Sequence, residues 1–85
     1  MGEVPNVLVI AGLDPSGGAG LVADVRVCEL HGCRPLAVAT ALTEQTTQGL
    51  RAVNPVDPAM VREQLIALLS DIELAAVKIG MLGSV

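Results

Sequence analysis

The 85-residue sequence contains no Phe, Trp or Tyr, and only five of its residues are Lys or Arg. Nucleic-acid-binding proteins need cationic side chains for phosphate groups, and many stack bases on aromatic rings. Because the net charge is also −4, we expect no nucleic-acid partner. No apolar run approaches the roughly 18 residues of a membrane span, and only a short apolar run follows Glu3 and Pro5. We therefore expect neither a membrane segment nor a signal peptide, and we expect a cytoplasmic location.

Cysteine and histidine are scarce, with Cys28, His31 and Cys33 as the only examples. Their spacing superficially resembles a set of metal ligands. However, structural zinc sites normally have four such residues, and these three fall across the predicted end of a helix. We expect no metal site, and we interpret the two cysteines as reduced, small apolar side chains of a cytosolic protein.

Glycine is abundant, and four glycines lie between Gly12 and Gly20. The uninterrupted apolar run 7–11 leads into this segment and is typical of a strand buried on both faces. A helical pattern over residues 20–31, ended by Gly32, leads out of it. A strand, a glycine turn and a helix start can direct backbone N–H groups toward a polar or anionic ligand. Glycine also occurs in ordinary connecting loops, so both interpretations stay open.

Residues 35–42 form a second apolar run and predict another buried strand, which the polar cluster 43–49 follows directly. If the two strands are parallel, their carboxyl ends lie at the same edge of the sheet, where α/β proteins bind ligands. The glycine segment and the polar cluster would then form one site.

The second half of the chain completes an α/β pattern. Residues 50–53 predict a short edge strand, and Asp57 followed by Pro58 predicts a helix start. Residues 75–82 predict a third buried strand, in which Lys78 either pairs with an internal charge or reaches past the strand end. This order predicts right-handed crossovers and a mainly parallel sheet. Two helices cannot cover both faces of such a sheet, so we interpret the chain as one edge of a larger domain.

Asp24 has an unusual position on the predicted helix, because it lies between Val27 and Cys28 on a helical wheel and nearly opposite Arg26. An acidic group on an apolar face costs free energy unless another group pairs with it. Asp24 is therefore either a structural hydrogen-bond acceptor tucked toward the loop or a functional group.

Two phosphate-binding motifs fit the glycine segment poorly. A Walker loop requires Lys-Ser or Lys-Thr after the glycines, and neither follows. Gly18-Ala-Gly-Leu-Val-Ala23 matches the Rossmann form G-x-G-x-x-A, but several residues separate it from the preceding strand. The acidic residue that should close a second strand is missing as well.

Three segments together closely resemble the hydroxymethylpyrimidine kinase and phosphomethylpyrimidine kinase family of thiamine biosynthesis, namely Ala11–Asp24, Ala39–Gly49 and Val77–Gly83. The resemblance implies a ribokinase-like, three-layer α/β/α fold, with residues 1–85 as the N-terminal part of a single kinase domain. It also implies ATP-dependent phosphorylation of 4-amino-5-hydroxymethyl-2-methylpyrimidine and of its monophosphate by the complete enzyme.

The same resemblance places Gly12, Asp24, Thr43, Gln45 and Met81 at the pyrimidine pocket. Gln45 would be the main group that recognises the ring, because its amide offers both donor and acceptor. Thr43 would contribute backbone contacts, and Met81 would pack near the ring. We expect no catalytic residue in the chain, because in this family the anion hole and the ATP and Mg²⁺ sites lie in the C-terminal portion.

The chain departs from the family pattern at three positions. The family usually has Asn where this chain has Thr46, and aromatic residues around the positions of Cys28 and Cys33. The difference at Thr46 puts the polar contacts near the pocket in doubt, and the differences at Cys28 and Cys33 put the local packing in doubt. Two alternatives stay open: a pyridoxine or pyridoxal kinase of the same fold, and a truncated, non-catalytic fragment. Because the predicted sheet lacks covering layers, we also expect self-association or a homo-oligomer.

Overall fold

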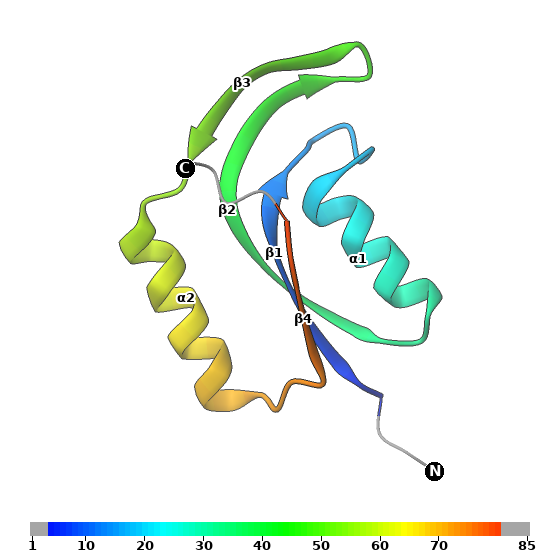
Figure 1. The fold of residues 1–85 in the computed structure, drawn as a ribbon, viewed down its shortest axis with the longest axis vertical. Coiled ribbons are helices and arrows are strands. Elements are labelled where there is room, and N and C mark those ends of the chain that lie inside the picture. Colours follow the sequence, from blue (N-terminus) through cyan, green and yellow to red (C-terminus); the bar gives the residue numbers. More distant parts are fainter. Residues whose placement is uncertain (1–3, 81–85) are drawn as a thin grey trace.

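The computed structural model describes residues 4–80 and has a four-stranded sheet with a helix on each side of it (Figure 1). The elements follow one another along the chain as β1 (Asn6–Leu13), α1 (Gly20–Leu30), β2 (Arg34–Thr46), β3 (Gly49–Pro55), α2 (Pro58–Asp71) and β4 (Ala76–Ile79). The strand order is β3-β2-β1-β4. β1 is parallel to β2 and to β4, whereas β2 and β3 are antiparallel. The expected α/β fold with a mainly parallel sheet is therefore confirmed.

Side-chain alternation along β1 shows which helix covers which face of the sheet. Val9 and Ala11 are buried in a cluster with Leu21 of α1. Ile10, which lies between them in the strand, lines a groove together with residues of α2. Because successive strand residues point to opposite faces, the two helices cover opposite faces. The molecule thus has the three layers expected of an α/β/α fold.

The two helices begin and end close to where the sequence predicts. Asp57 is the N-cap of α2, and its carboxylate accepts a hydrogen bond from the backbone N–H of Ala59 at 2.9 Å. Gly32 follows α1 with a φ of +74°, the left-handed conformation that glycine provides after a helix end. No residue of α2 is buried, so this helix packs on the sheet far more loosely than the N-terminal part of α1 does.

The polar cluster 43–49 differs from the prediction. The predicted strand 35–42 ends before this cluster, but β2 continues to Thr46 and β3 begins at Gly49, so most of the cluster forms the end of a hairpin. Thr favours extended backbone, and pairing with β3 satisfies the peptide groups of this segment. The ladder shifts register between Glu44 and Gln45, and such an irregularity changes the direction of the side chains beyond it.

The predicted edge strand 50–53 and third buried strand 75–82 correspond to β3 and β4. β4 is shorter than expected within residues 4–80, and the last residues of its predicted range lie outside the described part. It is also an exposed strand rather than a buried one, because every residue of Ala76–Ile79 is accessible to solvent. One edge of β4 pairs with β1, and within the described residues the other edge of β4 has no neighbouring strand.

Candidate functional site

The glycine segment between β1 and α1 folds around the buried carboxylate of Asp14. One carboxylate oxygen accepts hydrogen bonds from the backbone N–H and the hydroxyl of Ser16, at 2.9 and 2.6 Å. The other accepts from the backbone N–H of Ala19 at 3.1 Å. Hydrogen bonds from Ser16, led by its hydroxyl, hold the pKa of Asp14 below its ordinary value of 3.8. The carboxylate is therefore ionised and already saturated by its own loop.

Asp14 also supplies the negative group at the start of α1. The N-cap residue, Ala19, has no side chain that can accept a hydrogen bond. The Asp14 carboxylate accepts a hydrogen bond from the backbone N–H of this N-cap residue and so lies next to the start of α1, where a negative charge is favourable. The N–H groups of Ser16 and Ala19 thus face the chain's own carboxylate. Of the two interpretations left open for this turn, these bonds favour the connecting loop over a site for an external anion.

Gly20 brings the start of α1 against the end of β1. Its φ is +65°, and a Cβ atom built on it would lie 2.2 Å from the carbonyl oxygen of Gly12. No residue with a side chain fits at such a distance. The close approach places the backbone of Gly12 beside the loop, at the carboxyl end of β1.

A polar cavity of about 190 Å³ lies at this edge of the sheet. It is lined by the ends of β1 and β2, the glycine loop and the segment at β4, namely Ala11, Gly12, Asp14, Ala19, Gly20, Thr43, Gln45, Lys78 and Gly80. The predicted site residues Gly12, Thr43 and Gln45 therefore come together here. They converge because β1 and β2 are parallel, and Thr43 and Gln45 come just after Leu42, the residue of β2 that pairs with the last residue of β1.

A chain of hydrogen bonds fixes the orientation of Gln45. The hydroxyl of Thr43 donates to the carbonyl oxygen of Leu13 at 2.7 Å, so its own oxygen is left to accept. The side-chain Nε2 of Gln45 donates to that oxygen at 3.0 Å. One N–H of the amide is thereby used inside the protein. Within residues 4–80 the carbonyl oxygen and the second N–H of Gln45 have no bonded partner, so they can bind a ligand in the cavity.

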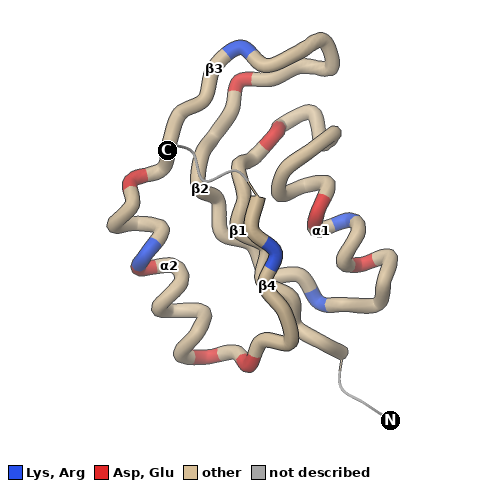
Figure 2. Tube along the Cα trace, viewed as in Figure 1, with Lys and Arg blue, Asp and Glu red and all other residues tan. Residues whose placement is uncertain are grey.

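Asp24 does not itself line the cavity. Its Oδ2 atom lies 2.7 Å from the Nζ atom of Lys78, which does line it. Figure 2 shows a blue segment in β4 and red segments in α1, the two elements that this ion pair connects. The acidic residue on the helix is thus one half of an ion pair between α1 and β4. The sequence left two possibilities for Lys78, an internal ion pair or a side chain that reaches past the strand end. The structure shows the ion pair.

Thr46, Cys28 and Cys33, which the sequence also singled out, do not line this cavity. Met81 lies outside the described residues. Thr46 is exposed in the hairpin, where its hydroxyl oxygen accepts from the backbone N–H of Gln48 at 3.1 Å. Cys28 packs against the cluster between α1 and the sheet, and both Cys28 and Cys33 are free thiols.

The described part of the chain lacks both a cluster of metal ligands and a membrane-spanning helix. Within residues 4–80, no three His, Cys, Asp or Glu side chains are grouped so that they could hold a metal ion. No helix in that part of the chain is long and apolar enough to cross a membrane.

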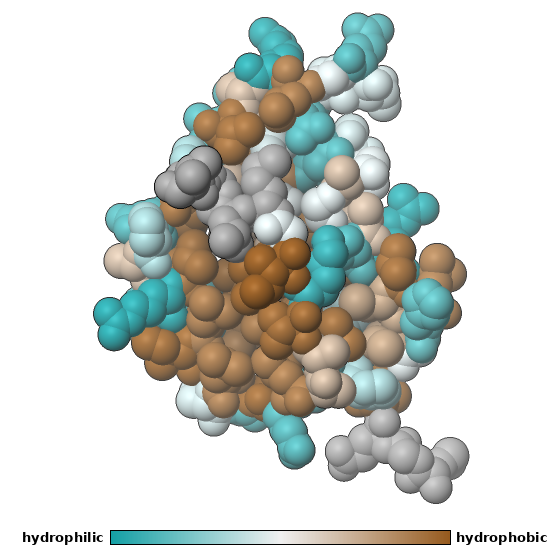
Figure 3. Space-filling model, in the orientation of Figure 1, coloured by the Kyte–Doolittle hydropathy of each residue, from teal (hydrophilic) through white to brown (hydrophobic). Residues whose placement is uncertain are grey.

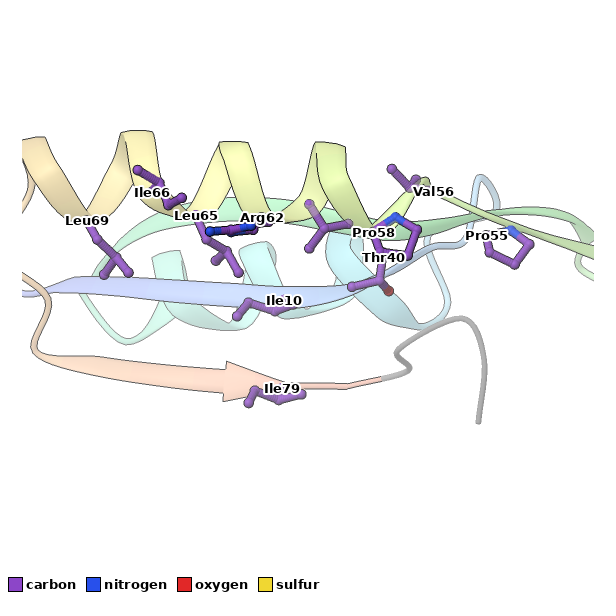
Figure 4. A pocket seen from close by; sticks show the side chains of 11 residues that line it. Ile10, Thr40, Pro55, Val56, Pro58, Arg62, Leu65, Ile66, Leu69 and Ile79 are labelled. Carbon is purple, nitrogen blue, oxygen red and sulfur yellow. The ribbon is translucent and has the colours of Figure 1, made fainter.

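A second, larger hollow of about 580 Å³ lies between α2 and the sheet (Figure 4). Its lining is mostly apolar, with Ile10 and Ile79 from the strands and Leu65 and Leu69 from α2. It shares no lining residue with the polar cavity. Polar groups that could orient a small ligand gather in the polar cavity, and we therefore place the candidate site there.

Comparison with known proteins identifies relatives of this chain. Residues 14–85 match the profile of the family described as phosphomethylpyrimidine kinase. The chain is 45% identical over 82 residues to a thiamine biosynthetic bifunctional enzyme of Arabidopsis thaliana, described as chloroplastic. This match covers 96% of the chain and 16% of the relative, so the chain spans about a sixth of that protein.

Two solved structures have the same fold over nearly the whole chain. A phosphomethylpyrimidine kinase from Clostridium difficile is 41% identical with a TM-score of 0.89, covering 94% of this chain and 35% of that one. A pyridoxal kinase from Staphylococcus aureus in complex with pyridoxal is 33% identical with a TM-score of 0.87, covering 98% of this chain and 31% of that one. These likenesses confirm the ribokinase-like fold expected from the sequence.

Proposed function

Because the chain belongs to the phosphomethylpyrimidine kinase family, we propose that it is the N-terminal part of a single kinase domain and carries the pocket for the phosphate acceptor. In this proposal the complete enzyme uses ATP to phosphorylate hydroxymethylpyrimidine and its monophosphate in thiamine biosynthesis. The family description and the name of the Arabidopsis thaliana relative support this activity and pathway.

The observation that carries the proposal is the oriented amide of Gln45 beside Gly12 and Thr43 at the polar cavity. An aminopyrimidine has an exocyclic amino group, which donates hydrogen bonds, next to a ring nitrogen, which accepts them. The free carbonyl oxygen and the free N–H of Gln45 form the complementary pair. Asp24 contributes indirectly, since it holds Lys78 at the cavity wall.

We assign ATP and Mg²⁺ to the complete enzyme and to residues other than those described here. Within residues 4–80 no acidic cluster fits Mg²⁺, and the glycine loop closes on Asp14, so its N–H groups do not form a cradle for phosphates. Phosphoryl transfer depends on groups that position the phosphates and stabilise their charge. The chain alone is therefore expected to bind the acceptor without phosphorylating it.

A cytoplasmic location is also part of the proposal. Its support is that Cys28 and Cys33 are both free thiols, the state in which reducing compartments keep cysteine.

The binding pocket is tested by comparing Gln45→Ala with Gln48→Ala. Gln48 lies in the exposed turn of the hairpin and does not line the cavity, so it is a matched control. We expect Gln45→Ala to weaken hydroxymethylpyrimidine binding by about 1–3 kcal/mol, the cost of losing a buried amide partner. Gln48→Ala should leave binding unchanged. Isothermal titration calorimetry on the two variants and the wild-type chain measures both effects.

Circular dichroism on the same samples shows whether each variant is folded. Equal affinities in a folded Gln45→Ala variant and the wild type would contradict the assignment of Gln45. If the folded wild-type chain bound no pyrimidine at all, the proposed pocket itself would be wrong.

Pyridoxal is the second candidate acceptor, because the Staphylococcus aureus relative was solved with pyridoxal bound. Titration with both compounds separates the two proposals. We expect the chain to bind hydroxymethylpyrimidine more tightly, since Gln45 complements an amino group next to a ring nitrogen, a pair that pyridoxal lacks. If the chain bound pyridoxal more tightly, pyridoxal and not hydroxymethylpyrimidine would be assigned as the acceptor.

A further inference from the structure

Two charged side chains line the polar cavity in the described part of the chain, Asp14 and Lys78. The Asp14 carboxylate is buried and bonded to Ser16 and Ala19 of its own loop. The Lys78 side chain is 53% exposed. Of these two charges, that of Lys78 is the more accessible to a ligand in the cavity.

The register of the sheet directs Lys78 toward this cavity. Lys78 pairs with Val9 across the β1–β4 ladder, and Val9 belongs to the cluster beneath α1. The Lys78 side chain therefore points to the face that α1 and the glycine loop cover. A Cβ atom built on Gly80 would lie 3.5 Å from the Nζ atom of Lys78. The ammonium group therefore lies beside Gly80, which also lines the cavity.

Lys78 retains hydrogen-bonding capacity after it pairs with Asp24. An ammonium group has three N–H donors. Within residues 4–80, Lys78 has one bonded partner, the Oδ2 atom of Asp24 at 2.7 Å. Because Asp24 does not line the cavity, it holds the ammonium group from the α1 side. The other donors can therefore bind an acceptor within the cavity.

From this arrangement we infer that Lys78 determines specificity at the site: it binds the phosphate of the acceptor, so that the cavity selects phosphomethylpyrimidine over hydroxymethylpyrimidine. The inference rests on the proposed function. A phosphate monoester carries about −1.5 to −2 charges at neutral pH and has three strong acceptor oxygens. Hydrogen bonds between charged partners are about twice as strong as neutral ones, and a hydroxymethyl group offers no charge.

Calorimetric titration of the full chain with each of the two pyrimidines tests this selectivity. We expect the wild type to bind phosphomethylpyrimidine about tenfold more tightly than hydroxymethylpyrimidine. Lys78→Met should lower the affinity for phosphomethylpyrimidine about tenfold and change that for hydroxymethylpyrimidine less than about twofold. Lys78→Arg should keep most of the selectivity, since it keeps the charge. Arg26→Met removes one positive charge from the exposed side of α1 and should leave both affinities unchanged.

A second measurement works on the unaltered protein and does not depend on the folding of a variant. Lys78 is the only lysine in the sequence, so lysine-selective isotope labelling gives one side-chain signal in an NMR spectrum. We expect phosphomethylpyrimidine to shift this signal more strongly than hydroxymethylpyrimidine does. Inorganic phosphate and ADP, added separately at the same concentration, should shift it little.

Each other outcome has a defined meaning. Equal losses for both pyrimidines in Lys78→Met, or a lysine signal that phosphomethylpyrimidine does not move, would overturn the inference and leave the proposed function standing. If ADP or inorganic phosphate shifted the lysine signal more than phosphomethylpyrimidine does, the inference that Lys78 binds the phosphate of the acceptor would be overturned. If the wild type bound neither pyrimidine, the proposed function would fail, and the inference with it.

Discussion

Gly20 leaves no room for a side chain, and this makes it a sensitive position in the described fold. Alanine there would have to adopt a φ of +65° and would direct its Cβ into the carbonyl oxygen of Gly12. A left-handed conformation alone costs about 1–2 kcal/mol, and the contact adds further strain. We therefore expect Gly20→Ala to lower the free energy of unfolding by about 2 kcal/mol or more, as measured by urea denaturation.

Gly18 is the matched control for this prediction. It belongs to the same loop, has no positive φ, and a Cβ atom on it would come no closer than 3.7 Å to another group. Gly18→Ala should change the free energy of unfolding by less than about 0.5 kcal/mol. Similar losses in both variants would show that the loop responds to any added side chain and that the contact with Gly12 is not special.

The site residues differ in how far the sequence could reveal them. The family resemblance indicated Gly12, Thr43 and Gln45, and the structure places these three at one cavity. Asp14 was missed, although its bonds are local and the pattern Asp-Pro-Ser favours a side chain that bonds two residues ahead. The partner of Asp24 could not be assigned, because Lys78 lies 54 positions away and their contact depends on where β4 lies in the sheet.

The loop that leads into α1 depends on the charge of Asp14 for the hydrogen bonds of Ser16 and Ala19. The pKa of this carboxyl is below 3.8 in the folded chain because Ser16 and Ala19 bond to the ionised form. A group with a lowered pKa contributes stability that is fully present above the unfolded value. That stability is lost as the pH falls through the lower, folded value. We therefore expect the contribution of Asp14 to be complete at neutral pH and to decrease progressively below pH 3.8.

Asp14→Asn isolates this effect, because asparagine keeps the shape of the side chain without the charge. The free energy of unfolding of the wild type should exceed that of the variant at about pH 6, and the difference should shrink at about pH 3. Urea denaturation followed by circular dichroism measures it. A difference that stayed constant between the two pH values would mean that the charge of Asp14 does not support the start of α1.

Most helices and strands could be predicted from local sequence patterns. The end of β2 could not, because it is a strand only through its pairing with β3. The uninterrupted apolar runs correctly indicated β1 and the first part of β2, and Asp57 with Pro58 correctly indicated the start of α2. The segment 43–49 is polar, so its composition alone favoured a loop. It is mostly strand because β3 pairs with it, and that partner becomes visible only when the two segments are considered as one hairpin.

The whole molecule has a continuous apolar surface over α2 and the exposed edge of the sheet (Figure 3). Ile66 and Leu69 of α2 are 50% and 58% exposed, and Val77 and Ile79 of β4 are 51% and 60% exposed. Leu69 and Ile79 line the groove of about 580 Å³ between α2 and the sheet. An edge strand beside an apolar groove favours pairing with another chain, because both unpaired peptide groups and apolar area can be covered at once.

We therefore expect the isolated 85-residue chain to self-associate through β4 and this groove. Light scattering coupled to size-exclusion chromatography should give a mass above the 8.7 kDa of one chain, increasing with concentration. Ile79→Lys places a charge at the edge strand and should shift the protein toward the monomer. Leu30→Lys is the matched control, because Leu30 is 85% exposed but lies at the end of α1, and it should leave the mass unchanged.

A wild type that is monomeric at every concentration would show that the exposed groove is not sufficient for association. Equal effects of the two substitutions would mean that added charge, and not the position of Ile79, controls the mass.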